Sequence, residues 1–151
     1  MRHLSRRAAL ALGAGSAAVT LVGWSNFALA TPQAAADDIA KFTGGAKPEQ
    51  GKISIELPEI AENGNTVPLA FSVDAPMTDA DYVSDVLVVA EGNPNPGVAT
   101  FHFTPLSGKA EASTRIRLAS TQNIVLVAKT SGGKFYTAQK LVKVTIGGCG
   151  G

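Results

Sequence analysis

The chain has 151 residues, a formal net charge of +1 and one cysteine, Cys149. Its length is that of a single domain. A nearly neutral charge provides neither the positive surface of a nucleic-acid-binding protein nor the polybasic patch of a protein that adheres to lipid. We therefore expect no nucleic acid and no membrane among its partners.

The first 30 residues are predicted to be an export signal. They contain Arg2, Arg6 and Arg7 and no acidic residue. A weakly apolar run rich in Ala and Gly follows the arginines, and residues 28–30 (Ala-Leu-Ala) fit the small-x-small pattern of a cleavage site. The three alanines at 34–36 are a second candidate site. Removing residues 1–30 takes away three arginines and changes the formal charge from +1 to −2.

The arginine pair indicates the route of export. Ser5-Arg6-Arg7 followed by Leu10 is typical of a twin-arginine signal, which in bacteria exports proteins that have already folded. A periplasmic location is therefore expected. A retained transmembrane helix is the alternative, although the apolar run is short against the roughly 20 residues that span a bilayer.

The remaining chain has the pattern of an all-β domain. Residues 37–42 are predicted to form a short helical turn that ends at Gly44-Gly45, and beyond it apolar and polar residues alternate as in half-buried strands. About seven short strands separated by turn residues favour an antiparallel β-sandwich of immunoglobulin-like kind over residues 37–146. The expected strands lie at 53–57, 67–73, 86–90, 101–103, 112–118, 124–128, 135–137 and 141–146.

The chain ends in Gly147-Gly148-Cys149-Gly150-Gly151. Glycine has no side chain to pack and loses the most entropy on ordering, and chain ends are poorly ordered unless something holds them. Residues 147–151 are therefore predicted to form a flexible arm, which when fully extended reaches roughly 15–18 Å. Such an arm could carry the thiol into a narrow cleft of another protein.

The lone thiol favours a carrier over a catalyst. An unpaired cysteine in an exported protein implies an intermolecular bond or a reactive thiol. A catalytic cysteine needs a base and an orienting group within hydrogen-bond distance, and the arm contains neither His nor Arg. The alternative is an incidental terminal cysteine that forms adventitious dimers.

Other candidate residues have simpler interpretations. His102 has no partner set for a metal, and the acidic residues near 74–85 lack the spacing of a calcium loop. Arg115 and Arg117 share a predicted strand face and could bind an anion, but a solvated face explains them as well. We predict no metal, no cofactor and no catalytic residue. The acidic residues are Asp74, Asp79, Asp81 and Asp85.

Four segments resemble the Y subunit of the Sox sulfur-oxidation carrier. The most specific is the C-terminal run 144–151 (Val-Thr-Ile-Gly-Gly-Cys-Gly-Gly). Residues 62–69 (Glu-Asn-Gly-Asn-Thr-Val-Pro-Leu) are similar to an early strand of that family. The run Gly-Asn-Pro-Asn-Pro at 92–96, together with Phe-His-Phe at 101–103, resembles the central hairpin of that family. Residues 115–118 (Arg-Ile-Arg-Leu) resemble one of its later strands.

This resemblance implies a carrier that is the substrate of other enzymes and is not itself an enzyme. It implies covalent attachment of thiosulfate-derived sulfur at Cys149, with Gly147, Gly148, Gly150 and Gly151 giving the arm its flexibility. The implied partners are a Z-type subunit in a heterodimer, a c-type cytochrome that loads the thiol, a sulfate-releasing hydrolase and a sulfane dehydrogenase. The competing hypothesis is a structural or adhesive β-sandwich locked as a homodimer by an intermolecular disulfide.

Overall fold

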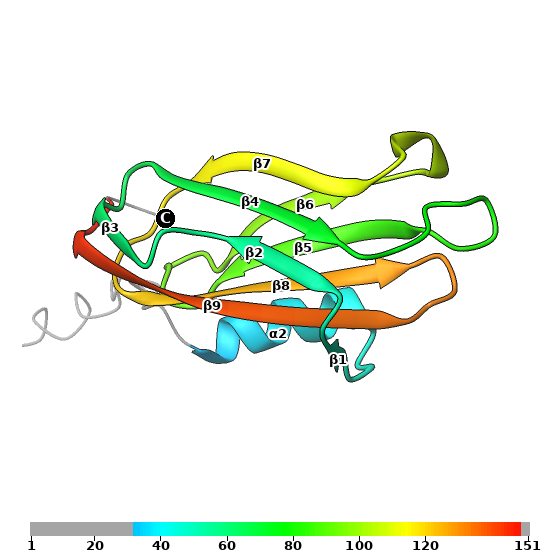
Figure 1. Ribbon diagram of the computed structural model, residues 1–151. Helices are drawn as coiled ribbons and strands as arrows, with labels where there is room; N and C mark the ends of the chain where they lie inside the picture. Colours follow the sequence, from blue (N-terminus) through cyan, green and yellow to red (C-terminus); the bar gives the residue numbers. More distant parts are fainter. Residues whose placement is uncertain (1–31, 149–151) are drawn as a thin grey trace, which may run out of the picture.

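Nine β-strands form two facing sheets within residues 32–148, the part of the chain that the computed structural model describes (Figure 1). The larger sheet has the order β1-β9-β8-β5-β6, with β3 also paired to β9, and the smaller sheet has the order β2-β4-β7. The strands are β1 (Glu49–Gln50), β2 (Ile53–Glu56), β3 (Ile60–Asn63), β4 (Val67–Val73), β5 (Val83–Ala90), β6 (Gly97–His102), β7 (Ala110–Ile116), β8 (Gln122–Thr130) and β9 (Phe135–Ile146). The predicted all-β sandwich is confirmed.

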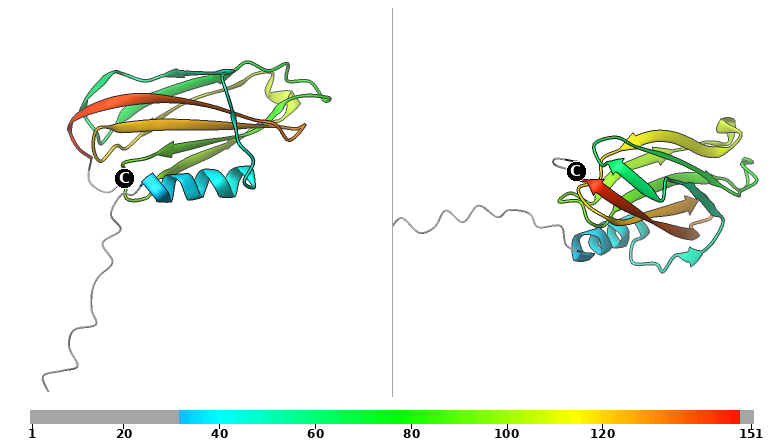
Figure 2. Two further views of the ribbon diagram at one scale, coloured as in Figure 1. Left: turned by 90° about the horizontal axis from the view of Figure 1, so that it is seen from below. Right: turned by 60° about the vertical axis from the view of Figure 1, so that its left-hand side comes forward.

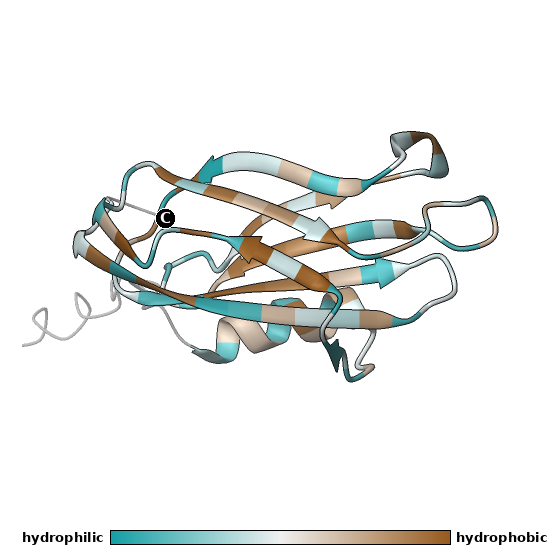
Figure 3. Cartoon of the chain, in the orientation of Figure 1, coloured by the Kyte–Doolittle hydropathy of each residue, from teal (hydrophilic) through white to brown (hydrophobic). Residues whose placement is uncertain are grey.

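Alternation along the strands builds the core between the sheets. In β4 the side chains of Val67, Leu69, Phe71 and Val73 are buried and those between them face outward, so that apolar and polar bands alternate along the strand in Figure 3. Strand β7 lies antiparallel beside β4, with Val67 opposite Ile116. Phe71 also packs edge-on against Phe101, with the ring centroids 5.2 Å apart, and so links the two sheets.

A helix that is longer than the sequence pattern predicted covers the outer face of the larger sheet. Helix α2 (Pro32–Thr43) has twelve residues instead of the short turn expected at 37–42, and it ends as predicted at Gly44 and Gly45, both with positive φ. Figure 2 shows the helix lying along this face of the sheet. Its residues Ala35, Ile39 and Phe42 form an apolar cluster with residues of β5 and β8. They recur at the i, i+4, i+7 spacing of one helix face.

The strand predictions need three corrections. The segments expected at 135–137 and 141–146 are one strand of twelve residues, β9. Strands β1 and β3 were not predicted, because β1 is exposed throughout and β3 buries only Ala61. Helix α2 begins at Pro32, five residues before the start of the predicted domain at 37. Among the described residues, 32–148, no helix is long and apolar enough to cross a membrane.

The start of α2 bears on the predicted cleavage site. Ala35 is only 1% exposed, so cleavage after Ala36 would remove a buried residue and the first turn of the helix. We predict that a chain beginning at Asp37 unfolds with a free energy about 1–2 kcal/mol lower than a chain beginning at Thr31. Urea denaturation of the two chains measures the difference. Equal midpoints would show that the first turn of α2 contributes nothing.

Candidate functional site

The last strand brings the chain, just before the cysteine in the sequence, to one end of the sandwich. Strand β9 is paired with β8 as far as Val142, and from Lys143 to Ile146 it is paired with β3, which runs parallel to it with Asn63 beside Ile146. Gly147 and Gly148 follow β9 and are described. Cys149, Gly150 and Gly151 lie outside the described residues, as do Arg6 and Arg7 of the predicted signal.

Three backbone hydrogen bonds hold the residues that precede the cysteine. The N–H of Gly64 donates to the carbonyl of Ile146 at 2.7 Å, the N–H of Leu118 to the carbonyl of Gly64 at 2.8 Å, and the N–H of Gly148 to the carbonyl of Leu118 at 2.9 Å. Segments that lie far apart in the sequence therefore meet at Gly148. We call the group Gly64, Leu118 and Gly148 the anchor.

At the two glycines of the anchor only glycine fits, because a side chain would collide with neighbouring backbone atoms. A Cβ on Gly64 would lie 2.2 Å from the Leu118 oxygen and 2.8 Å from the Gly148 nitrogen, and one on Gly148 would lie 2.8 Å from the Gly64 oxygen. A Cβ on Gly147 would lie 2.1 Å from the oxygen of Ala119. Gly148 is also buried. The structure thus differs from the predicted flexible arm at Gly147 and Gly148, because both are packed against backbone and Gly148 is hydrogen-bonded.

A buried pair of amide side chains supports the segment on which Gly148 rests. Asn93 is 2% exposed, and its Nδ2 donates to the carbonyl of Arg117 at 2.8 Å while its Oδ1 accepts the N–H of Ala119 at 2.9 Å. Gln122 donates through Nε2 to the same Oδ1 and accepts the N–H of Gly92. Leu118 therefore lies between two residues that Asn93 holds directly.

Comparison with known proteins assigns the chain to a family. The family model described as "Sulfur oxidation protein SoxY" matches residues 39–149. The chain belongs to the SoxY family. The match includes the anchor and has Cys149 as its last residue. Membership ties the chain to sulfur oxidation and supports a role as a sulfur carrier.

Solved structures agree with this assignment. The sulfur carrier protein SoxY from Chlorobium limicola f thiosulfatophilum is 36% identical, with a TM-score of 0.63 over 77% of this chain and 100% of that one. The superoxide reductase (neelaredoxin) from Ignicoccus hospitalis is 20% identical, with a TM-score of 0.55 over 78% of this chain and 95% of that one. The second likeness concerns the fold alone. No curated protein matches the chain significantly.

The other candidates from the sequence are not brought together into a site. His102 is paired through Nδ1 with Asp85, its neighbour across β5 and β6. Arg115 lies on β7, whereas Arg117 lies beyond the end of that strand. Within residues 32–148, no group of three or more His, Cys, Asp or Glu side chains could hold a metal ion.

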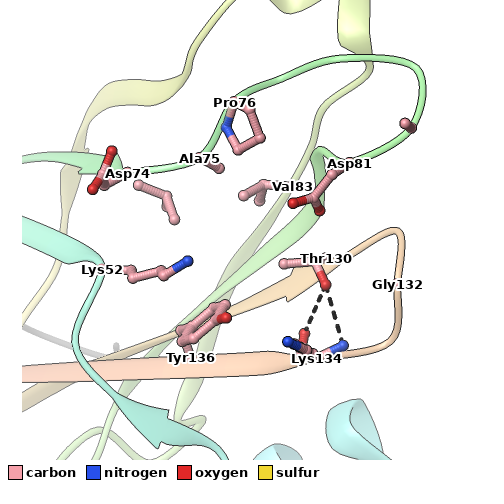
Figure 4. A pocket seen from close by; sticks show the side chains of 12 residues that line it. Lys52, Asp74, Ala75, Pro76, Asp81, Val83, Thr130, Gly132, Lys134 and Tyr136 are labelled. Atoms are coloured by element: carbon pink, nitrogen blue, oxygen red, sulfur yellow. Dashed lines mark hydrogen bonds between the residues drawn. The ribbon is translucent and has the colours of Figure 1, made fainter.

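A pocket of about 300 Å³ lies where the β1–β2 connection, the β4–β5 loop and the β8–β9 turn meet (Figure 4). It is at the opposite end of β9 from Cys149. Two lysines and two aspartates line it, so its charges balance, and Lys52 places its Nζ 4.8 Å from the centre of the Tyr136 ring. The lining residues are Lys52, Val73, Asp74, Ala75, Pro76, Ala80, Asp81, Val83, Thr130, Gly132, Lys134 and Tyr136.

The buried amide pair should be important for stability. Replacing Asn93 with Ala leaves the N–H of Ala119 and the carbonyl of Arg117 without their partner, and we expect Asn93→Ala to lower the free energy of unfolding by about 2–3 kcal/mol. Asn95→Ala in the same loop is the matched control, because Asn95 is exposed, and it should change the value by less than about 0.5 kcal/mol. Urea denaturation measures both. A similar small effect for the two variants would contradict the role of Asn93.

Proposed function

We propose that this chain is the cysteine-bearing subunit of a periplasmic sulfur carrier, which holds thiosulfate-derived sulfur covalently on Cys149. One observation carries the proposal: the SoxY family match includes Cys149, the only cysteine in the chain, and Cys149 comes one residue after Gly148, whose N–H is hydrogen-bonded to the carbonyl of Leu118. The thiol therefore follows directly after an anchored residue.

The proposed chemistry needs only a thiol that other proteins can reach. In the loading step the outer sulfur of thiosulfate bonds to Sγ of Cys149, the thiol proton leaves, and two electrons pass to a c-type cytochrome. A hydrolase then adds water to the terminal sulfonate and releases sulfate, which leaves a persulfide on Cys149. Sulfur–sulfur bonds form and break at thiolates, so the carrier needs no catalytic group of its own.

The composition of the anchor supports a carrier over a catalyst. The hydrogen bond that holds Gly148 is accepted by the backbone carbonyl of Leu118, and the close contact beside it is the backbone of Gly64, so neither supplies a titratable group that could accept the thiol proton. Catalysis on Cys149 is therefore assigned to the partners: the loading cytochrome, the hydrolase and a sulfane dehydrogenase. A Z-type subunit is the proposed heterodimer partner, and the twin-arginine signal would let it leave the cytoplasm bound to this chain.

The first test concerns attachment. We expect Cys149→Ser to keep the fold and subunit pairing but to abolish sulfur loading, because the hydroxyl cannot form the sulfur–sulfur bond. Intact-mass spectrometry after incubation with thiosulfate and the loading cytochrome should show an S₂O₃ adduct on the unmodified chain alone. Adducts that persist on the serine variant would refute the assignment. Purification as a disulfide-linked homodimer, with no second subunit bound after reduction, would favour a structural sandwich.

The second test concerns access. If partner clefts admit the chain end because it is slim, Gly150→Val should reduce enzymatic loading at least about tenfold, since a small misplacement of the reacting group is costly. The melting temperature and the rate of alkylation by iodoacetamide should stay near those of the unmodified chain, because Gly150 lies beyond β9, the last strand of the sandwich. Loading at an unchanged rate would show that the glycine is not needed for access.

A further inference from the structure

The anchor holds Gly148, the residue to which the cysteine is attached, in a fixed position. Gly148 is buried and donates its N–H to Leu118, whose own N–H donates to Gly64. Consecutive Cα atoms are about 3.8 Å apart, so the Cα of Cys149 lies within that distance of an anchored residue. From Gly148, the three remaining residues span at most roughly 10–11 Å, against the 15–18 Å of a five-residue arm.

Of the three anchor residues, Gly64 has the least room for a side chain. It does not adopt the left-handed φ of Gly44 or Gly45, so an alanine could take its backbone conformation. The obstacle is contact, because a Cβ there would lie 2.2 Å from the oxygen that receives Gly148, 2.8 Å from the Gly148 nitrogen and 3.0 Å from a methyl of Val144. Any side chain at Gly64 therefore acts on the bond between Leu118 and Gly148.

We propose that Gly64 is a positioning residue for Cys149. Its missing side chain lets Gly148 dock on the carbonyl of Leu118, and this docking fixes the residue from which the chain continues to Cys149. Gly147 and Gly148 are accordingly glycines because they pack closely against backbone, whereas the access argument applies to Gly150. The effect on loading rests on the proposed function, while the docking itself does not.

Hydrogen bonds to the residues on either side of Leu118, and burial of its side chain, hold the docking carbonyl of Leu118 in place. Arg117 and Ala119, on either side of Leu118, are both hydrogen-bonded to the buried Asn93, which is fixed in turn by Gln122. The side chain of Leu118 is fully buried in the core. Movement of the docking carbonyl would therefore break buried hydrogen bonds and unpack a core residue, so the chain end is held by the scaffold and not by another loose segment.

The docking is tested by amide exchange of the purified chain together with any subunit that co-purifies. In nuclear magnetic resonance spectra, the N–H of Gly148 should exchange at least about tenfold more slowly than that of Gly150. Gly64→Ala should bring the two rates within about twofold, while the amides of β5 and β8 stay protected. Gly132→Ala is the matched control, because its Cβ would have only an ordinary 3.8 Å contact, and it should leave the Gly148 rate unchanged. Equal rates for Gly148 and Gly150 in the unmodified chain would overturn the proposal.

A second variant keeps the test decisive if Gly64→Ala does not fold. Gly148 follows the last strand, so Gly148→Ala should leave the sandwich intact and still release the chain end, because its Cβ would lie 2.8 Å from the Gly64 oxygen. The amide at position 148 should then exchange as fast as that of Gly150. Continued slow exchange in this variant would contradict the close packing at the anchor.

Loading kinetics separate positioning from a general loss of stability. In Gly64→Ala we expect kcat/KM for enzymatic loading to fall about tenfold, while alkylation of Cys149 by iodoacetamide is at least as fast as before. A variant that was only destabilised would load normally below its melting temperature, and that result would refute the positioning role. Absence of loading in the unmodified chain would refute the proposed function and leave the exchange result standing.

Discussion

The larger sheet has two apolar faces, and the whole arrangement depends on covering both of them. Strand β5 is buried at five successive positions, from Val86 to Ala90, and β8 at five, from Ile124 to Ala128. One set of these side chains faces the smaller sheet and the other faces α2. A two-layer sandwich would leave Leu87, Val89, Val125 and Val127 in water, at a cost of about 1.5–3 kcal/mol for each large side chain. The helix is therefore part of the core, although it lies outside both sheets.

Period-two alternation predicted most of this fold because it reflects burial on one face of a strand. It failed where that relation fails. Strand β1 buries nothing, β3 has a single buried residue, and α2 shows its apolar face only when Ala35 is considered together with Ile39 and Phe42. The position of Cys149 as the candidate site was evident from the sequence. The docking of Gly148 was not, because it depends on residues 64 and 118, and no local pattern shows that these segments meet.

Glycine at the chain end has two different physical meanings. Sequence reasoning treats every glycine of the terminal run as a source of freedom, which is correct for a residue with no neighbours. At Gly147 and Gly148 the absence of a side chain instead allows backbone atoms to approach closely enough for a hydrogen bond. The same residue type therefore allows the close packing of the chain immediately before the cysteine.

Strand β9 also has a mechanical consequence for anything that grips the chain end. It is hydrogen-bonded to β8 along one edge and to β1 and β3 along the other, and the C-terminus continues from it. Ladder hydrogen bonds run across the strands, so a pull along β9 loads many of them together in shear. Peeling β9 off one bond at a time would require a pull perpendicular to the strand. If a partner protein binds the chain end and then withdraws along the strand axis, many hydrogen bonds of β9 oppose the pull at once. We therefore expect the sandwich to stay folded through repeated binding and release of its end.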